Sequence, residues 1–404
     1  MLRFCFSECT SPRSTSNSIH PIHIEASLPR AGRPSVLAAT LDSVTHRLTR
    51  DQARRIVVRA QLLDAERPGD VVEVAEQLGY IKIDPTATIA PCEQTVLWSR
   101  IGWSYEPGQL QKAVETDRLL FELDGAFRPV SMLPLMLPGM RSRPLRESTK
   151  EWLQANDRFR GDVLARLRAE GPLLASDIPD TAQVSRAPDG WSGSNQVPIM
   201  LDLLSRLGVT AIVGREGRHR RWDLAERAYP HDMPEYGAEE ASALLAERRL
   251  QAAGITRPHR YWSGVAKTTG EPAVVEGSEW RFRVDPEAIA ALEREDDGGR
   301  VAFLNPYDSL LFDRARLTEL FDFTYVLEQF KPKSQRVYGF FAHPILMGDR
   351  FVGMLDAELD RAHDVLRVNA VHELVAFEPE ETEMVRAEID ALGEWLGVAV
   401  AGLA

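Results

Sequence analysis

The sequence predicts an α+β protein made of tandem winged-helix modules followed by a C-terminal antiparallel β-domain or small barrel. Helical segments are repeatedly followed by hairpin-like pairs of short strands, which is the order of elements in a winged helix. Residues 301–374 instead hold several segments in which apolar and polar residues alternate, as in half-buried strands. We expect a disordered N-terminal tail at 1–44 and three winged-helix modules at 45–150, 151–235 and 236–298. A β-domain with a terminal helix should follow at 299–404.

The composition is that of an ordinary globular protein, with 44% hydrophobic and 27% charged residues among 404. Residues 1–44 are rich in Ser, Pro and Arg and lack periodicity, so we expect disorder there. The net charge of −12 argues against a uniformly basic surface for nucleic acid but allows a local basic stripe. Three Cys cannot form a disulfide framework, which favours a reducing, cytoplasmic setting, and the excess of Arg over Lys fits a GC-rich bacterial genome.

Some classes of site have no support in the sequence. A membrane span would need roughly eighteen consecutive apolar residues, and no such run occurs. There is no P-loop and no dinucleotide fingerprint. Cys5 and Cys9 have no matching second pair, and the histidines lack metal-ligand spacing. We therefore expect no cofactor, no metal and no membrane contact, and the sequence does not decide the oligomeric state.

The first module begins with a capping box at 49–52, which starts a helix with Ile56 on its apolar face. Arg54 and Arg55 lie mostly away from that face. They are candidate DNA-phosphate contacts, although a solvated helix face is the more common role for such residues.

A second helix is expected from Asp70 to Gly79, which is a natural left-handed end residue. A strand at 80–84 should follow, and these elements fit the opening of a winged helix. Residues 127–140 contain three prolines, so we expect an ordered connector or extended loop there.

The second module contains a helix at 199–207 and then a hairpin that spans 209–223. A hairpin directly after a helix is the arrangement of a wing. Its arginines are candidate contacts to the phosphates of DNA, and a merely solvated hairpin explains them equally well; they are Arg215, Arg218, Arg220 and Arg221.

The rest of the chain repeats the helix-then-hairpin order once and then becomes β-rich. A helix is expected at 239–253 and a hairpin at 274–284. Strands are expected at 337–341, 351–356 and 365–371, and an amphipathic helix at 380–396.

Lys82 and Asp84 are candidate catalytic residues. If 80–84 is a strand, Ile81 and Ile83 face one way, and Lys82 and Asp84 face the other. Pro85 then ends the pairing. A carboxylate held beside a basic group can serve a hydrolytic site. On spacing alone, an exposed strand face with a weak ion pair is the favoured interpretation.

Several segments together resemble the YcaQ/AlkZ family of winged-helix DNA glycosylases. They are Leu78 to Thr86, Val96-Leu-Trp-Ser-Arg100, Leu224 to Arg227, Leu304-Asn-Pro-Tyr-Asp-Ser-Leu-Leu-Phe-Asp-Arg314 and Met347 to Gly353, and the similarity spans roughly 45–400. The family usually carries Gln-apolar-Asp or Gln-apolar-Gln before its Leu-Trp-Ser-Arg-like helix. Asp84 matches that pattern, and Lys82 stands where the family has its first Gln. Residues 90–95 likewise differ from the Glu-Arg-Ala-His-His stretch of the YcaQ branch.

The resemblance implies an enzyme that acts on double-stranded DNA and hydrolyses the N-glycosidic bond of alkylated or crosslinked purines. Asp84 would activate water or stabilise an oxocarbenium-like sugar. Lys82 has three interpretations, in order of preference: an ion pair with Asp84, a contact to a flanking phosphate, or an amine nucleophile of a glycosylase-lyase. The alternative function is a non-catalytic winged-helix DNA binder or regulator, which Lys82 and the acidic net charge favour.

Overall fold

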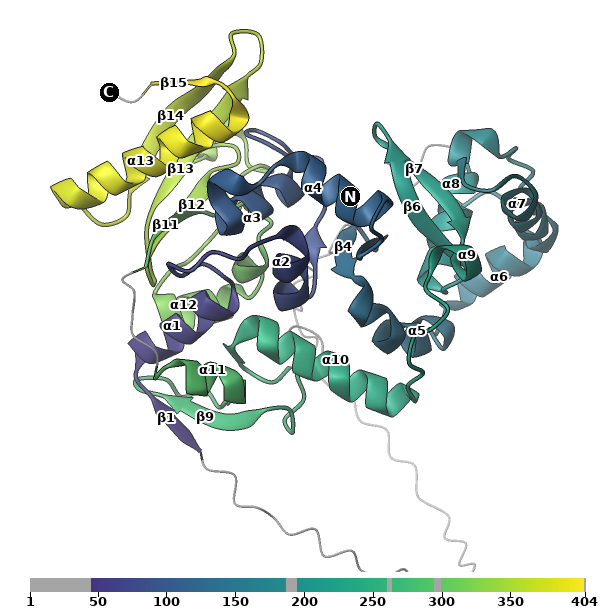
Figure 1. Ribbon diagram of the computed structural model, residues 1–404, viewed down its shortest axis with the longest axis horizontal. Coiled ribbons are helices and arrows are strands. Elements are labelled where there is room, and N and C mark those ends of the chain that lie inside the picture. The colour runs from purple at the N-terminus through teal and green to yellow at the C-terminus, as the bar shows by residue number, and fades with distance from the viewer. Residues whose placement is uncertain (1–44, 187–194, 260–263, 294–298, 403–404) are drawn as a thin grey trace, which may run out of the picture.

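The computed structural model describes residues 45–186, 195–259, 264–293 and 299–402. The expected N-terminal tail at 1–44 lies outside these residues. The described ranges form an α+β fold with three sheets. In Figure 1, the C-terminal sheet and its helix lie at one end of the molecule and the helices of residues 147–206 lie at the other.

The four-stranded sheet joins the start of the chain to its middle, in the order β1 (His46–Leu48), β9 (Glu271–Val275), β10 (Phe282–Val284), β8 (Ile255–Thr256). β1 pairs in parallel with β9, a pairing that the sequence analysis did not predict. β9 and β10 form the expected antiparallel hairpin. The helices beside this sheet are α1 (Arg50–Ala60), α10 (Ala238–Ala253) and α11 (Pro286–Ala291).

The capping box that begins α1 is confirmed. The Thr49 hydroxyl accepts the main-chain N–H of Gln52 at 3.1 Å, and the Gln52 side-chain oxygen accepts the N–H of Thr49 at 2.9 Å. These two bonds satisfy amides that the first turn leaves unpaired. α1 then buries Ile56 and Val57 against the four-stranded sheet and residues of the 302–354 region.

The six-stranded sheet runs in the order β2 (Ile81–Lys82), β4 (Ala126–Pro129), β3 (Leu120–Leu123), β6 (Thr210–Glu216), β7 (His219–Leu224), β5 (Leu173–Leu174). It therefore connects the first two expected modules through the pair β3 and β6. The helices around it are α2 (Val71–Leu78), α3 (Cys92–Ile101), α4 (Pro107–Glu115), α5 (Leu133–Arg141), α6 (Glu147–Ala155), α7 (Asp157–Glu170), α8 (Val197–Arg206) and α9 (Ala225–Ala228).

Two expectations for the first module are corrected. The strand expected at 80–84 is only the two residues of β2, which pair with β4. Residues 127–140 are not a loop, because most of them belong to β4 and α5. Pro134 lies in the first turn of α5, where a missing N–H costs nothing. Pro138 lies inside the helix, where it removes one main-chain hydrogen bond, so α5 forms despite it.

The C-terminal sheet runs in sequence order: β11 (Val301–Phe303), β12 (His343–Met347), β13 (Arg350–Asp360), β14 (Val365–Glu373), β15 (Ala399–Ala401). It is antiparallel as expected, except that β15 pairs in parallel with β14 at the edge. α12 (Arg314–Phe321) and α13 (Pro379–Leu396) complete this region. The strand expected at 337–341 is wrong, because these residues form an irregular segment leading into β12.

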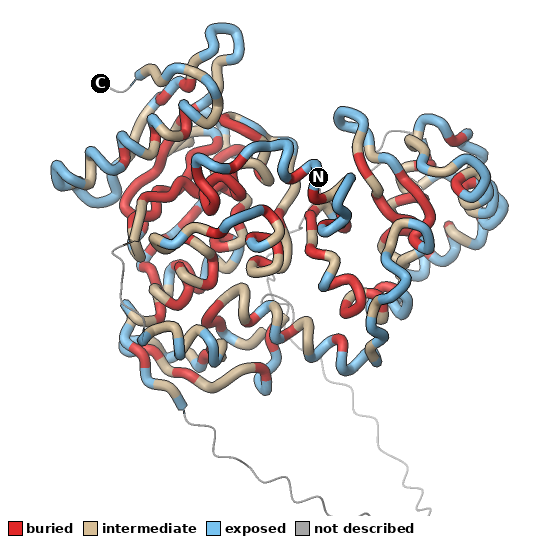
Figure 2. Tube along the Cα trace, in the orientation of Figure 1, coloured by how far each residue is buried: buried red, intermediate tan, exposed pale blue. Residues whose placement is uncertain are grey.

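The buried residues show how the parts are joined. One core combines α2, α3 and Ile81 with the inner face of the C-terminal sheet, including Ile345 and Leu355. A second core combines α1 with the four-stranded sheet and α12. In Figure 2, red, buried stretches gather where these helices meet the C-terminal sheet. The first and last expected modules therefore share one hydrophobic core, whereas residues 152–224 have their own.

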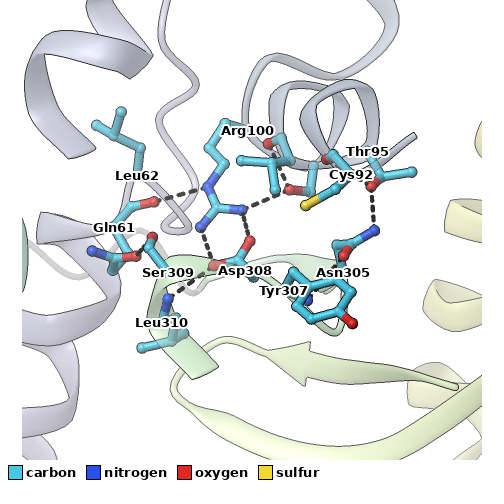
Figure 3. A network of polar contacts seen from close by, with 12 residues as sticks. Gln61, Leu62, Cys92, Thr95, Arg100, Asn305, Tyr307, Asp308, Ser309 and Leu310 are labelled. Carbon is cyan, nitrogen blue, oxygen red and sulfur yellow. Dashed lines mark hydrogen bonds and ion pairs between the residues drawn. The ribbon is translucent and has the colours of Figure 1, made fainter. Parts of the chain in front are cut away.

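A buried ion pair fixes α3 to the C-terminal region (Figure 3). The two terminal nitrogens of the Arg100 guanidinium contact the two carboxylate oxygens of Asp308, and both side chains are fully buried. Its Nε–H donates to the main-chain oxygen of Gln61 at 3.2 Å, and Nη1 also donates to the Ser99 hydroxyl at 2.9 Å. Asp308 also accepts the amide of Leu310 at 3.0 Å. Because each charge is paired and bonded, the pair can be held out of water. Asp308 therefore links α3 to the 304–314 block.

Asn305 makes a second link at the same interface. Its side-chain nitrogen donates to the Thr95 hydroxyl of α3 at 2.8 Å. A third link joins the Ser309 hydroxyl to the Gln61 side-chain oxygen at 2.8 Å. The block that begins Leu304-Asn-Pro-Tyr-Asp is thus a hydrogen-bonded joint between the two ends of the chain.

Asp308→Asn should destabilise the fold strongly, because it leaves the buried Arg100 charge without a counter-charge. We expect a loss of about 3–5 kcal/mol in the free energy of unfolding, measured by urea denaturation. Asp322→Asn is the matched control, since Asp322 pairs with Arg50 but its side chain is 71% exposed. Its cost should stay below about 1 kcal/mol. Equal losses in the two variants would contradict this role for the buried pair.

Candidate active site

Asp84 lies in the segment that leads from β2, at the edge of the six-stranded sheet, to α3. Its carboxylate oxygen Oδ1 accepts the main-chain N–H of Thr86 at 2.9 Å, across Pro85. This turn, in which an Asp side chain bonds the backbone two residues on, orients the carboxylate. The residue is only partly buried. Asp84 is therefore a fixed carboxylate with access to solvent.

Lys82 does not form the ion pair with Asp84 that the sequence analysis favoured. Its amine donates to the main-chain oxygen of Ile83 at 2.9 Å and to that of Gly125 at 3.2 Å. An ammonium group has three N–H donors, so one is left for a further acceptor. The amine thus joins the end of β2 to the β3–β4 turn.

The β3–β4 turn that bonds Lys82 is marked in the sequence by Asp124-Gly125, a signal that sequence reasoning missed. Asp124 and Gly125 have φ of +53° and +68°, the conformation of a two-residue hairpin turn. Asp-Gly between two apolar segments is a strong hairpin signal. A Cβ at position 125 would lie 3.3 Å from the Lys82 amine, so glycine also leaves room for that contact.

Glu93, in the first turn of α3, is a candidate that sequence reasoning missed. Within the described residues, its Oε2 atom is buried and has no hydrogen-bond partner. Burial raises the pKa of Glu93 above its ordinary value of 4.5, while the main-chain amides of Glu93 and Asp84 and the charge of Arg215 act in the opposite direction. A Glu in the first turn of a helix is common for reasons of the helix dipole, so nothing in the sequence singled it out.

The C-terminal domain contributes Tyr307 to the neighbourhood of Asp84. Burial, followed by the negative charge of Asp84, raises the pKa of Tyr307. The Tyr307 hydroxyl accepts the side-chain N–H of Gln329 at 2.5 Å. Burial also raises the pKa of the Cys92 thiol, and the charges of Glu93, Asp308 and Asp84 add to that rise. Asp84 is therefore within electrostatic reach of both α3 and the 304–314 block.

Gln94, on α3 next to Glu93, is oriented by Tyr105. The Tyr105 hydroxyl donates to the Gln94 side-chain oxygen at 2.6 Å. The main-chain oxygen of Tyr105 in turn accepts the indole N–H of Trp395 at 3.0 Å, so α13 helps to hold this corner. The amide of Gln94 is left with its nitrogen as the donor end.

Two arginines of the basic hairpin are used inside the fold. Arg215 and Arg220 both contact the carboxylate of Glu122 at 2.8 Å, and the Glu122 side chain is only 1% exposed. Arg220 also contacts Asp202 of α8 at 3.0 Å. These pairs hold β3 against the hairpin, so the two guanidinium groups already serve a structural purpose.

The other candidate DNA contacts lie in different settings. Arg218 and Arg221 are exposed, and Arg221 donates to the main-chain oxygen of Pro172 at 3.3 Å. Arg54 is 17% exposed and bonds Asp349 at 3.0 Å. Arg55 is partly buried on α1. Of the candidate DNA contacts, Arg218 and Arg221 are therefore exposed on the hairpin, whereas Arg54 on α1 is already paired with Asp349.

A cavity of about 600 Å³ lies between α5 and α10, with Pro134, Asp232 and Leu244 among its lining residues. Neither Asp84, Lys82 nor Glu93 lines it. Over the described part of the chain, no three His, Cys, Asp or Glu side chains are grouped to hold a metal ion. No helix in those ranges is long and apolar enough to cross a membrane.

Comparison with known proteins gives one family and a fold match. The model of the family described as "DNA glycosylase AlkZ-like" matches residues 75–395, which include Asp84, Glu93 and Tyr307. Among solved structures, the chain is similar to the Streptomyces sahachiroi DNA glycosylase AlkZ, with a TM-score of 0.58 and 16% sequence identity. That match covers 88% of this chain and 99% of the other. The shared architecture thus extends across nearly the whole relative.

Glu93→Gln should change stability in a pH-dependent way. Below about pH 4.5 the carboxyl is protonated in both folded and unfolded states, and no charge is buried. As the pH rises through the raised pKa, the wild type must bury a carboxylate, whereas the amide stays neutral. The melting temperature of Glu93→Gln relative to wild type should therefore be higher at about pH 7.5 than at about pH 4.5.

Glu147→Gln is the control for that measurement, because the Glu147 side chain is 74% exposed. Its difference from wild type should vary much less between the two pH values. If the Glu93→Gln difference were the same at both, Glu93 would not be a carboxyl with a raised pKa.

Proposed function

This chain belongs to the DNA glycosylase AlkZ-like family, and from that membership we propose that it hydrolyses the N-glycosidic bond of an alkylated or crosslinked purine in double-stranded DNA. The observation that carries the proposal is the Asp84 carboxylate, which its Thr86 contact orients between β2 and α3. The proposal includes the tandem winged-helix interpretation, in which α8 and the β6–β7 hairpin form one such unit.

The chemistry needs little beyond a fixed carboxylate. A purine alkylated on N7 is cationic, so it leaves as a neutral base when it takes the electron pair of the N-glycosidic bond. The sugar becomes oxocarbenium-like, and the Asp84 carboxylate stabilises that positive charge. Water then bonds to the anomeric carbon and gives its proton to Asp84 or to solvent. Glu93 lies beside the same segment, because the main-chain amide of Asp84 is one of the groups that oppose the rise in its pKa.

Lys82 acts as a positioning residue in this proposal. Two of its N–H donors bond main-chain oxygens. Within the described residues the amine makes no ion pair with Asp84, so the third donor is not used there. That donor suits a phosphate beside the lesion. A cation close to a developing cation also opposes the reaction, so the family's Gln would serve the transition state better.

Asp84→Asn should abolish base release, because an amide cannot offset a positive sugar. We expect a fall of at least about a hundredfold in the single-turnover rate with N7-alkylated and crosslinked duplexes. Asp157→Asn is the matched control, with a side chain that is 67% exposed on α7, and it should keep the wild-type rate. If wild type released no base from any lesion while still binding duplex DNA, the non-catalytic alternative would replace this proposal.

Lys82→Gln should raise the rate of base release a few-fold, because it removes a positive charge near the sugar. Borohydride trapping should yield no protein–DNA adduct with wild type. Lys112→Gln, at an exposed lysine on α4, should change neither result. A trapped adduct that is lost in Lys82→Gln would instead identify the amine as the nucleophile of a glycosylase-lyase.

Arg218→Ala should weaken binding to undamaged duplex and make it less sensitive to salt. If the exposed guanidinium contacts one phosphate, the slope of log K against log salt should fall by about 0.9 in magnitude. Arg160→Ala, on the exposed face of α7, should leave the slope unchanged. An unchanged slope in Arg218→Ala would remove this residue from the DNA interface.

A further inference from the structure

The segment between α12 and β12 contains an exposed aromatic side chain on a tightly held loop. Residues 328–340, named here the Phe330 loop, include Phe330, which is 71% exposed. Val337 is 66% exposed and Phe340 is 42% exposed in the same loop. Large apolar side chains so exposed in one short segment are a mark of an interaction surface.

The loop is held closed from within by a buried carboxylate. Glu328 is 4% exposed, and its Oε2 atom accepts the main-chain N–H of Val337 at 2.7 Å and of Tyr338 at 2.8 Å. Its other oxygen contacts the Lys331 amine at 2.9 Å. These bonds tie the beginning of the loop to its end. Phe330 is therefore presented by an ordered backbone.

Two further contacts attach the loop to the rest of the molecule. The Gln329 side chain donates to the Tyr307 hydroxyl, and the charge of Asp84 contributes, after burial, to the raised pKa of Tyr307. Gly339, with φ of +124°, lies against β13, where an added Cβ would come within 2.5 Å of the Asp356 carboxyl. Phe330 therefore directly follows Gln329, whose side chain bonds the Tyr307 hydroxyl.

The charge of the loop indicates the kind of partner. Between positions 329 and 343 there are three cations and no Asp or Glu, in a chain with a net charge of −12: Lys331, Lys333 and Arg336. Arg336 also lies 4.9 Å from the ring centre of Phe340. Apolar side chains surrounded by cations suit a polyanion with flat, stackable groups, which is the chemistry of nucleic acid.

We propose that the Phe330 loop is a stacking wedge for duplex DNA, in which Phe330 fills the gap left when a base leaves the helix and Lys333 and Arg336 contact the adjoining phosphates. Enzymes that act on a base must take it out of the stack, and an inserted apolar side chain offsets the lost stacking. This inference rests on the proposed function for the identity of the DNA, but it concerns a surface outside the Asp84 carboxylate.

Trp103 is the natural comparison, because it is even more exposed, at 88%. Residues 101–108 around it include Glu106 and no Lys or Arg. The same degree of apolar exposure therefore occurs there without a Lys or Arg in the adjoining sequence, and the Arg67 guanidinium near Gly102 lies 3.8 Å from the Glu388 carboxylate.

The test compares two labelled duplexes that differ at one position: one intact, one with a tetrahydrofuran abasic site. Phe330→Ala should lower the affinity for the abasic duplex about tenfold, the effect of losing one base–aromatic stack, and change that for intact duplex less than about twofold. Phe330→Trp should keep the preference for the abasic duplex. Trp103→Ala should bind both duplexes as wild type does. Phe330 is exposed, so unchanged melting temperatures should accompany these results.

Some outcomes would overturn the wedge. One is wild-type affinity of Phe330→Ala for both duplexes, as expected if the loop meets a protein instead. Another is an equal loss on both duplexes, or an equal effect of Trp103→Ala. Failure of the proposed function is distinguishable, because it would appear as absent base release while the Phe330-dependent preference for the abasic duplex persists.

Discussion

The buried contact between Arg100 and Asp308 is the constraint on which the arrangement of this protein depends. It joins the end of α3 to the 304–314 block, although the two residues lie 208 positions apart in the sequence, and both side chains are fully buried. A buried ion pair adds little net stability against apolar residues, but leaving one charge unpaired is costly. The pair therefore selects one relative position of the first and last parts of the chain. Because α3 also begins next to the Asp84 segment, that choice brings Tyr307 within electrostatic reach of Asp84, and Gln329 bonds Tyr307.

A buried charge also fixes the position of the β6–β7 hairpin. Glu122 is buried on β3, and Arg215 and Arg220 neutralise it from the neighbouring strands. These contacts tie the β6–β7 hairpin to β3, in the way that the Arg100–Asp308 contact ties the 304–314 block to α3. Positive side chains that looked like one basic surface in the sequence are thus divided between the interior contacts of the fold and an exposed remainder, Arg218 and Arg221.

The sequence was sufficient for elements with strong local signals. The Thr49 capping box, the left-handed Gly79, the hairpin after α8 and the terminal helix α13 all occur where periodicity and end residues predicted them. Local rules failed where tertiary contacts decide. β1 exists only by pairing with β9, more than two hundred residues away, and α5 forms although it contains Pro138. In the candidate site, motif resemblance identified Lys82 and Asp84. The burial of Glu93 and the direction of the Lys82 amine depend on β3 and β4, which alternation along one strand cannot reveal.

The proposed role of Asp84 is to stabilise positive charge on a deoxyribose, and the binding of a transition-state mimic tests that role without knowledge of the lesion. Affinity would be measured for a duplex with a cationic pyrrolidine in place of one sugar and for the same duplex with neutral tetrahydrofuran. Wild type should prefer the cation by about tenfold or more, since a charge-assisted contact contributes roughly 1.5–3 kcal/mol, and Asp84→Asn should lose that preference. Equal binding of the two duplexes by wild type would contradict the account.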